Sequence, residues 1–179
     1  MKFVFGVCVL VLTMAMVAPE TSNAQFNKGK MFLGPAIDLG RNVIGLGAQF
    51  EVGISDNIGI GGIARYWGDS ETFSSGESSW SLIVIQATGY YHFMPGQNLD
   101  PYVGARLGYA VYDFSFDSNI PGYSYTGGGE SGLFLNGAGG LRYFFNRSIA
   151  INGSLEFRLA GEKYFDDDLA FLVGVDFLL

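Results

Sequence analysis

The chain has one histidine and one cysteine to offer for acid–base or nucleophilic catalysis, and their placement does not suggest an active site. His92 is the only histidine among the 179 residues, and Cys8 is the only cysteine. Hydrolysis by a Ser-His-Asp triad requires a nucleophile and a carboxylate that can serve one imidazole. Alternation places His92 inward, at the strand end away from the long loops, so we expect it in a core or turn role. We therefore predict no catalytic residue and no bound cofactor.

A second set of residues, eight charges within alternating segments, has a regular placement. They are Asp38, Glu51, Arg65, Arg106, Arg142, Glu156, Arg158 and Asp176. Because side chains alternate across a strand, parity places all eight on the face opposite the apolar one. Four are arginines and four are carboxylates, so the charges on this face balance. We expect them to form a network of ion pairs.

These charges need strands to position them, and the sequence contains eight segments with a period of two. The clearest, residues 102–112, reads YVGARLGYAVY and alternates apolar residues with small, aromatic or charged ones. The segments span 32–40, 43–55, 58–67, 81–93, 102–112, 133–145, 149–159 and 169–179. Short connections follow the second, fourth and sixth segments. Longer polar stretches follow the third, fifth and seventh, at 68–79, 113–130 and 160–168. The first connection, at 41–42, is the exception because it is also short. Short periplasmic turns and longer extracellular loops are typical of bacterial outer-membrane barrels.

The apolar face distinguishes a membrane barrel from a soluble one. In a soluble lipocalin-type barrel, which is the alternative, this face would turn inward and the glycine-rich face outward. Soluble sheets use charged residues, especially lysine, on exposed strands, but after residue 24 lysine occurs only at positions 28, 30 and 163. Arginine or lysine facing lipid at mid-depth costs about 2–4 kcal/mol, which accounts for an apolar face without charge. We predict an all-β fold, an eight-stranded antiparallel up-and-down transmembrane β-barrel over residues 32–179.

The first 24 residues have the features of a cleaved signal peptide. Lys2 gives a positive start, an apolar run follows, and Ser22-Asn23-Ala24 offers a small-residue cleavage site. An N-terminal membrane anchor is the alternative, but the run is short for a span of about 20 residues. We expect residues 25–31 to lead into the barrel, and a mature chain without cysteine that is exported to the cell outer membrane.

Four motifs give the chain a family likeness. They are PYVGARLGYAVY at 101–112, GAGGLRYFF at 137–145, IAINGSLEFRL at 149–159 and LAFLVGVDFLL at 169–179. In these the chain resembles small bacterial outer-membrane β-barrel proteins of the OmpX/OmpA type. The resemblance implies contact with outer-membrane lipid and lipopolysaccharide, and insertion by the barrel-assembly machinery. Leu179 departs from the aromatic residue on which the family usually ends, and the peptidoglycan-binding domain of OmpA-type proteins is not expected.

The long loops are acidic. Their acids are Asp69, Glu71, Glu77, Asp113, Asp117, Glu130, Glu162, Asp166, Asp167 and Asp168, against two bases, Arg41 and Lys163. Solvation explains most of these charges, while Asp166, Asp167 and Asp168 are weak candidates for a divalent cation site because carboxylate oxygens suit such ions. A net charge of -7 argues against nucleic acid as a partner.

One loop suggests a docking surface. The alternation of 102–112 continues through Phe114 and Phe116, and Tyr123 and Tyr125 follow in the same loop. A protruding sheet edge can pair with a strand of a surface protein partner. We predict a non-enzymatic outer-membrane protein with a structural or surface-interaction role and a lumen closed by ion pairs. A narrow channel or transporter for small molecules, hydrophobic or not, is the alternative, and a lipid-modifying enzyme is the third reading.

Overall fold

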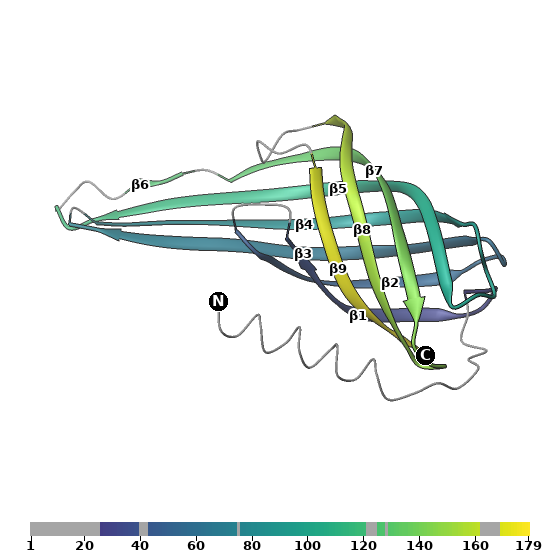
Figure 1. The fold of residues 1–179 in the computed structure, drawn as a ribbon. Coiled ribbons are helices and arrows are strands. Elements are labelled where there is room, and N and C mark those ends of the chain that lie inside the picture. The colour runs from purple at the N-terminus through teal and green to yellow at the C-terminus, as the bar shows by residue number, and fades with distance from the viewer. Residues whose placement is uncertain (1–25, 40–42, 75, 121–124, 128, 162–168) are drawn as a thin grey trace.

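The computed structural model describes residues 26–39, 43–74, 76–120, 125–127, 129–161 and 169–179 (Figure 1). The expected signal peptide, the candidate metal ligands Asp166, Asp167 and Asp168, and Tyr123 lie outside these described residues. The strands are β1 Met31–Asp38, β2 Gly45–Gly53, β3 Ile58–Phe73, β4 Gly76–His92, β5 Leu99–Ser118, β6 Tyr125–Thr126, β7 Glu130–Phe144, β8 Ile149–Gly161 and β9 Leu169–Leu178. Within the described chain no helix is long and apolar enough to span a membrane.

Eight long strands close into a barrel, and every pairing is antiparallel. The hydrogen-bonded order runs β4-β3-β2-β1-β9-β8-β7-β5, and β4 pairs with β5 to complete the ring. The two-residue strand β6 adds to β5 outside the ring. The predicted eight-stranded up-and-down barrel is confirmed. The prediction succeeded because period-two alternation identifies a strand and the face that it turns inward.

The barrel wall has an apolar outside and a polar inside. Along β4, Ile83 and Ile85 are exposed, whereas Gln86, which follows Ile85, and Tyr90 further on are buried. On β5, Leu107 is 56% exposed and its neighbour Arg106 only 1%. An outward apolar face and an inward polar face are what a transmembrane barrel requires.

Three strands run beyond the wall, and here the predicted loops are wrong. Residues 68–79 were expected as a loop, but β3 and β4 stay paired as far as Phe73 opposite Gly76. β4 and β5 stay paired to Gly76 opposite Ser118. Turn-forming composition misled the prediction because cross-strand pairing outweighs the weak strand propensity of glycine, serine and aspartate.

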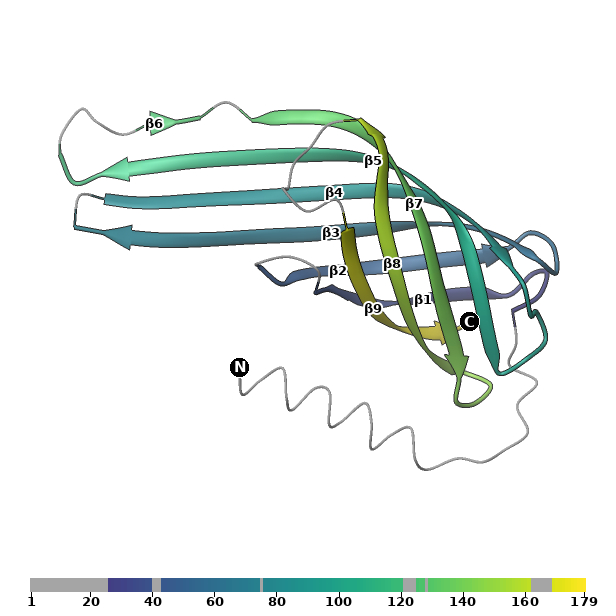
Figure 2. The ribbon, with the colours of Figure 1, turned by 45° about the horizontal axis from the view of Figure 1, so that its top comes forward.

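We call this projecting sheet the extension. It comprises residues 67–73 of β3, 76–82 of β4 and 112–118 of β5, together with β6. The neighbours in the barrel stop short of it, because β2 pairs with β3 only as far as Tyr66 and β7 pairs with β5 only as far as Tyr112. Figures 1 and 2 show β3, β4 and β5 side by side well past the ends of the other strands of the ring, with β6 next to their outer part. The opposite end of the barrel, with the short connections, is called the turn end.

Hydrophobic clusters occupy both ends of the lumen. The turn-end cluster consists of Phe26, Phe32, Phe144 and Ala150. The extension-end cluster consists of Trp67, Leu82, Val84, Ala110 and Phe134. The buried charged side chains lie on the same inward faces between these two clusters, so the barrel has a polar middle with apolar ends.

Candidate functional site

The polar middle contains a group of buried charges centred on Glu156. Its carboxylate accepts hydrogen bonds from Arg65 Nη2 at 3.0 and 3.2 Å and from Arg106 Nη1 at 2.7 Å. Asn136 Nδ2 also donates to it. Arg65 Nη1 in turn donates to Asp38 Oδ2 at 2.9 Å. One carboxylate on β8 thus joins an arginine of β3 and an arginine of β5, the two strands that flank β4.

Neutral side chains complete the contacts of the same arginines. Arg106 Nε donates to the Tyr90 hydroxyl at 2.7 Å, and Arg106 Nη2 donates to Ser154 Oγ at 2.8 Å. Arg65 Nη2 donates to Gln86 Oε1 at 2.6 Å. Additional hydrogen bonds of this kind are needed for a buried ion pair to offset the cost of leaving water.

A second group lies toward the turn end. Glu51 accepts hydrogen bonds from Arg142 Nη2 at 2.7 Å and lies 2.7 Å from His92 Nε2. Arg142 Nε donates to Asp176 Oδ2 at 2.7 Å. The other ring nitrogen of His92 lies 2.6 Å from Asp100 Oδ2. Each of these side chains is at least 95% buried.

The structure brings together seven of the eight charges that the sequence singled out. The eighth, Arg158, is half-buried on β8 beside a register shift between β7 and β8. The alternation did not give the partner of Arg106, which pairs with Glu156 on β8. That partner depends on the stagger between barrel strands, which is set by the shear.

Two members of the second group were not identified as such from the sequence. Asp100 was assigned to a turn, yet it is fully buried and contacts His92. Extending the inward parity of β5 from Tyr102 back by two residues would have placed Asp100 in the lumen. His92 was expected inward in a core or turn role, but its contact with two carboxylates was not foreseen.

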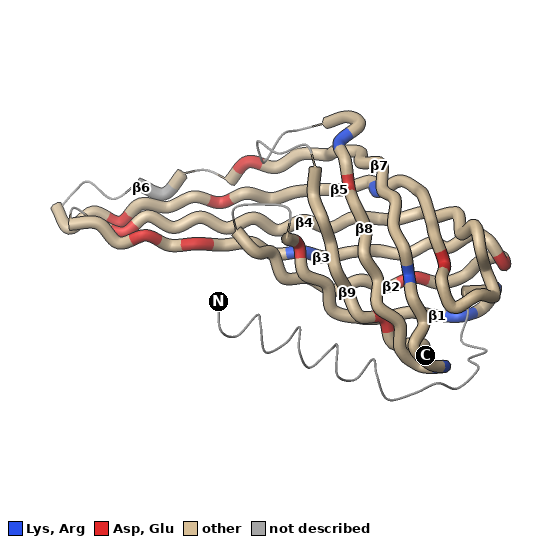
Figure 3. The backbone as a smooth tube through the Cα atoms, viewed as in Figure 1, with Lys and Arg blue, Asp and Glu red and all other residues tan. Residues whose placement is uncertain are grey.

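The extension has a different character, with exposed acids and half-buried aromatic side chains. Asp69, Glu71, Glu77, Asp113 and Asp117 are all exposed on it (Figure 3). Phe114 and Phe116 are half-buried, and alternation along β5 puts them on the same side of the strand as Tyr112, the side that faces the lumen further down. The Tyr112 ring stacks with that of Trp80, with 6.3 Å between the centroids. Of the other docking candidates, Tyr125 pairs through its backbone with Phe116.

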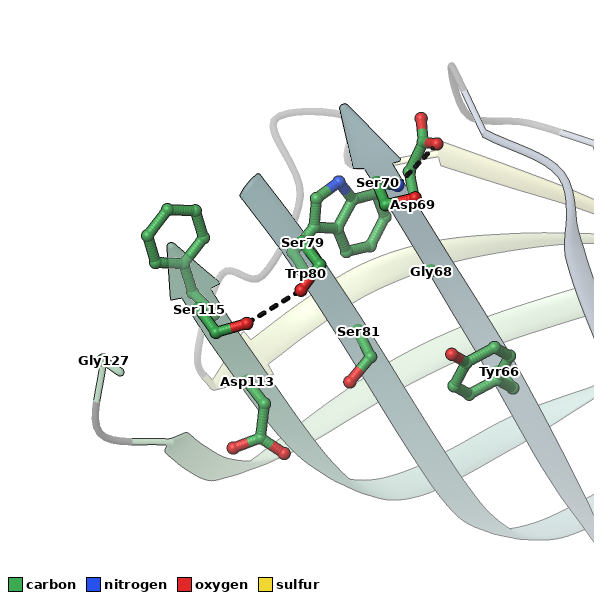
Figure 4. A pocket seen from close by; sticks show the side chains of 11 residues that line it. Tyr66, Gly68, Asp69, Ser70, Ser79, Trp80, Ser81, Asp113, Ser115 and Gly127 are labelled. Carbon is green, nitrogen blue, oxygen red and sulfur yellow. Dashed lines mark hydrogen bonds between the residues drawn. The ribbon is translucent and has the colours of Figure 1, made fainter. Parts of the chain in front are cut away.

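An open cleft lies on the extension next to the barrel wall (Figure 4). Its volume is about 580 Å³, and its lining includes Tyr66, Ser81, Asp113 and a hydrogen-bonded pair, Ser79 and Ser115, whose hydroxyls are 2.8 Å apart. Hydroxyls and a carboxylate at this cleft can donate to and accept from a polar ligand. Among the described residues no cluster of three potential metal-ligating side chains occurs.

Comparison with solved structures identifies barrels of the same fold. The Ail protein of Yersinia pestis, in complex with the heparin analogue sucrose octasulfate, is 14% identical, with a TM-score of 0.60 over 85% of this chain and 99% of that one. The N-terminal β-barrel domain of Pseudomonas aeruginosa OprF is 17% identical, with a TM-score of 0.55 over 85% and 98%. OprG of Pseudomonas aeruginosa is 14% identical, with a TM-score of 0.53 over 85% and 94%. At these identities the likeness shows the fold alone.

Sequence comparison identifies the family. A search of curated proteins found no match to the chain. A family model, the outer membrane protein beta-barrel domain, matches residues 6–177. That match covers nearly the whole chain and agrees with the closed barrel and its apolar outer surface. The chain therefore belongs to the outer membrane protein β-barrel domain family.

Proposed function

We propose that this protein is a non-enzymatic barrel of the outer membrane that presents the extension to a partner at the cell surface. In this proposal residues 1–24 are a cleaved signal peptide, 25–31 form a lead, and the barrel-assembly machinery inserts residues 32–179 among lipid and lipopolysaccharide. The observation that carries the proposal is the three-stranded extension. Seven strand residues reach about 20 Å beyond the wall at roughly 3.3 Å each, further than membrane crossing requires.

The side chains inside the barrel support this role over transport. An eight-stranded barrel has an interior just wide enough for side chains to fill. Here ion pairs fill the middle and hydrophobic clusters fill both ends. A cavity beside Glu51, Arg142 and Asp176 measures only about 10 Å³, near the size needed for one water molecule.

Conductance in planar bilayers tests the closed lumen. We expect the refolded protein to show no large channel, and Arg106→Ala to lose stability without opening one, because its neighbours can relax into the small space. A steady ion or solute flux through the unaltered protein would instead support the transporter alternative. Unchanged melting of a folded Arg106→Ala barrel would show that the network does not hold the lumen together.

The charge of the extension indicates the chemistry of the partner. The described residues of the extension include five exposed acids and no lysine, arginine or histidine. Ail was crystallised with sucrose octasulfate, a polyanion, and an acidic surface would repel such a ligand. We therefore propose a cationic partner.

The outer part of β3 supplies a place for strand addition. Beyond Tyr66, β4 is the only strand of the described chain that pairs with β3, so its other edge presents backbone donors and acceptors. Asp69 and Glu71 alternate along this edge with Ser70 and Thr72. An extended peptide that adds to the edge with alternate basic residues would match both the backbone pattern and the charge.

Deletion of residues 114–126 tests the surface role. The probe is a synthetic peptide of alternating lysine and valine, measured by fluorescence anisotropy on the refolded protein, with sucrose octasulfate as the competing anionic ligand. We expect the intact protein to bind the peptide and ignore the sulfated sugar. The deletion should lose most of the binding while the barrel stays folded, because the outer parts of β4 and β3 then lose the support of β5. Equal binding by the deletion variant would contradict the proposed role.

A further inference from the structure

A short segment ahead of the first strand closes the turn end of the barrel. Residues 26–30 fold back over the end of β2, where Gly29 N donates to Gly53 O at 2.8 Å and Gly53 N donates to Lys30 O at 2.9 Å. Gly29 has φ = 84°, a left-handed conformation that glycine adopts without strain. Two backbone hydrogen bonds and this turn fix the direction in which Phe26 enters the lumen.

Phe26 lies inside the barrel mouth and is fully buried. It belongs to the turn-end cluster with Phe32 of β1, Phe144 of β7 and Ala150 of β8. Its ring also stacks on His92 of β4, with centroids 3.6 Å apart and planes 8° from parallel. These neighbours come from well-separated parts of the wall, since β4 lies three strands from β1 and from β8 in the ring. One side chain from outside the barrel wall thus occupies the mouth.

The surface under Phe26 is charged. His92 lies between Glu51 Oε1 at 2.7 Å and Asp100 Oδ2 at 2.6 Å. A neutral imidazole has one N–H, whereas an imidazolium donates from both nitrogens and therefore satisfies both carboxylates. A cation against an aromatic face is attracted by the ring quadrupole. The proton that lets His92 donate to both carboxylates therefore also strengthens the contact between the imidazole and the Phe26 ring.

We propose that residues 26–30 are a plug of the periplasmic mouth, and that Phe26 seated on protonated His92 is its latch. The charged and titratable groups facing this latch are Glu51 on β2, Asp100 on β5 and, beyond Glu51, Arg142 on β7, with the Tyr102 ring 5.5 Å from His92. Loss of the proton removes one hydrogen bond and leaves two buried carboxylates against a neutral ring. The plug is therefore tight at low pH and loosens as pH rises. This inference concerns the periplasmic end and is independent of the surface role.

Cysteine labelling measures the seal, because the sole native cysteine, Cys8, lies in the proposed signal peptide. The reporter is Ala150→Cys, at a buried position of the turn-end cluster, treated with a water-soluble maleimide in the refolded barrel. Each rate is divided by that of Thr72→Cys, at an exposed position of the extension, measured at the same pH. We expect Phe26→Ala to raise this ratio about tenfold or more, as for a local opening. Lys28→Ala, at an exposed position of the same segment, should leave the ratio unchanged.

The dependence on pH separates a latch from simple packing. Between about pH 5 and about pH 9 the ratio should rise in the otherwise unaltered chain. It should not rise with pH in His92→Gln, nor in Phe26→Leu, which keeps bulk in the mouth without an aromatic face. If His92→Gln fails to fold, Phe26→Leu decides the point. Equal protection of the reporter with and without the Phe26 ring would overturn the plug, and a ratio that does not change with pH would overturn the latch.

Discussion

Carboxylates occur in two regions of this molecule under opposite conditions. In the barrel, Glu156 is 2% exposed and accepts hydrogen bonds from two arginines. On the extension, Glu77 of β4 is exposed and lies directly opposite another acid, Asp117, on the neighbouring strand β5. The first carboxylate is matched by cations because the barrel wall excludes water from it. The second faces water, which solvates it without a partner.

This contrast separates the residues that hold the fold from those free to interact. A buried charge left without its partner strongly destabilises a protein, whereas an exposed one contributes little in either direction. The lumen therefore tolerates few changes at its charged positions. The extension can carry an excess of one sign at little cost to folding, and that excess is available to attract a partner from solution.

The largest effect should come from the shared carboxylate of the lumen. Glu156→Ala leaves Arg65 and Arg106 buried without their common acceptor, and breaking a buried pair in this way costs about 3–5 kcal/mol. We expect the variant to unfold at a much lower urea concentration than the unaltered barrel, or not to refold. Loss of the heat-dependent shift in electrophoretic mobility that marks folded barrels would report the same failure.

Glu71→Ala is the matched control, because Glu71 is an exposed acid of the extension. Its removal should change the free energy of unfolding by less than about 0.5 kcal/mol. The contrast between the two regions would be broken if both substitutions had the same effect on the unfolding midpoint.

A middle-sized effect should come from a glycine at the extension end of the lumen. A Cβ on Gly108 would lie 2.2 Å from the ring of Phe134, its partner on β7. Because Phe134 packs in the extension-end cluster, Gly108→Ala forces that cluster to shift, and overpacking of this kind costs about 1–3 kcal/mol. Urea unfolding monitored by tryptophan fluorescence measures it, since Trp67 belongs to the same cluster.

Gly89→Ala provides the comparison on the lipid side of the wall. No atom lies within 4 Å of a Cβ built there, so the substitution should be neutral or slightly stabilising, as alanine restricts the unfolded chain more than glycine does. Equal destabilisation by Gly108→Ala and Gly89→Ala would mean that the fit of Phe134 over Gly108 does not matter.

The barrel wall could be predicted from the sequence because each strand carries its own signal. A residue such as Arg106 lies between Ala105 and Leu107, and parity alone assigns it to the inside. The carboxylate with which Arg106 pairs could not be predicted. That choice depends on the stagger between β5 and β8, and the pattern within one strand carries no information about it. Alternation thus predicts the faces of the strands, and closure determines the partners.

The sequence did not predict the three-stranded extension or the plug, and the physical reasons differ. Residues such as Gly68 and Ser79 have the composition of a turn, and only their cross-strand partners make them strand residues. Phe26 stands outside every alternating segment, so its burial follows from a turn at Gly29 that returns the chain over the mouth. Both features rest on contacts between segments far apart in the sequence.

The smallest effect, opposite in sign, should come from reversing one charge of the extension. Glu77 and Asp117 are directly opposite on β4 and β5, and like charges in this position are destabilising, whereas an opposite pair contributes about 0.2–1 kcal/mol. Glu77→Lys should therefore stabilise the extension and slow hydrogen exchange at the neighbouring Ser79 and Ser115 amides, which lie opposite each other on β4 and β5. Global unfolding should not change, because exchange in a projecting sheet follows local opening. Unchanged exchange in Glu77→Lys would show that water already screens this repulsion fully, and that the acids of the extension do not interact through the sheet.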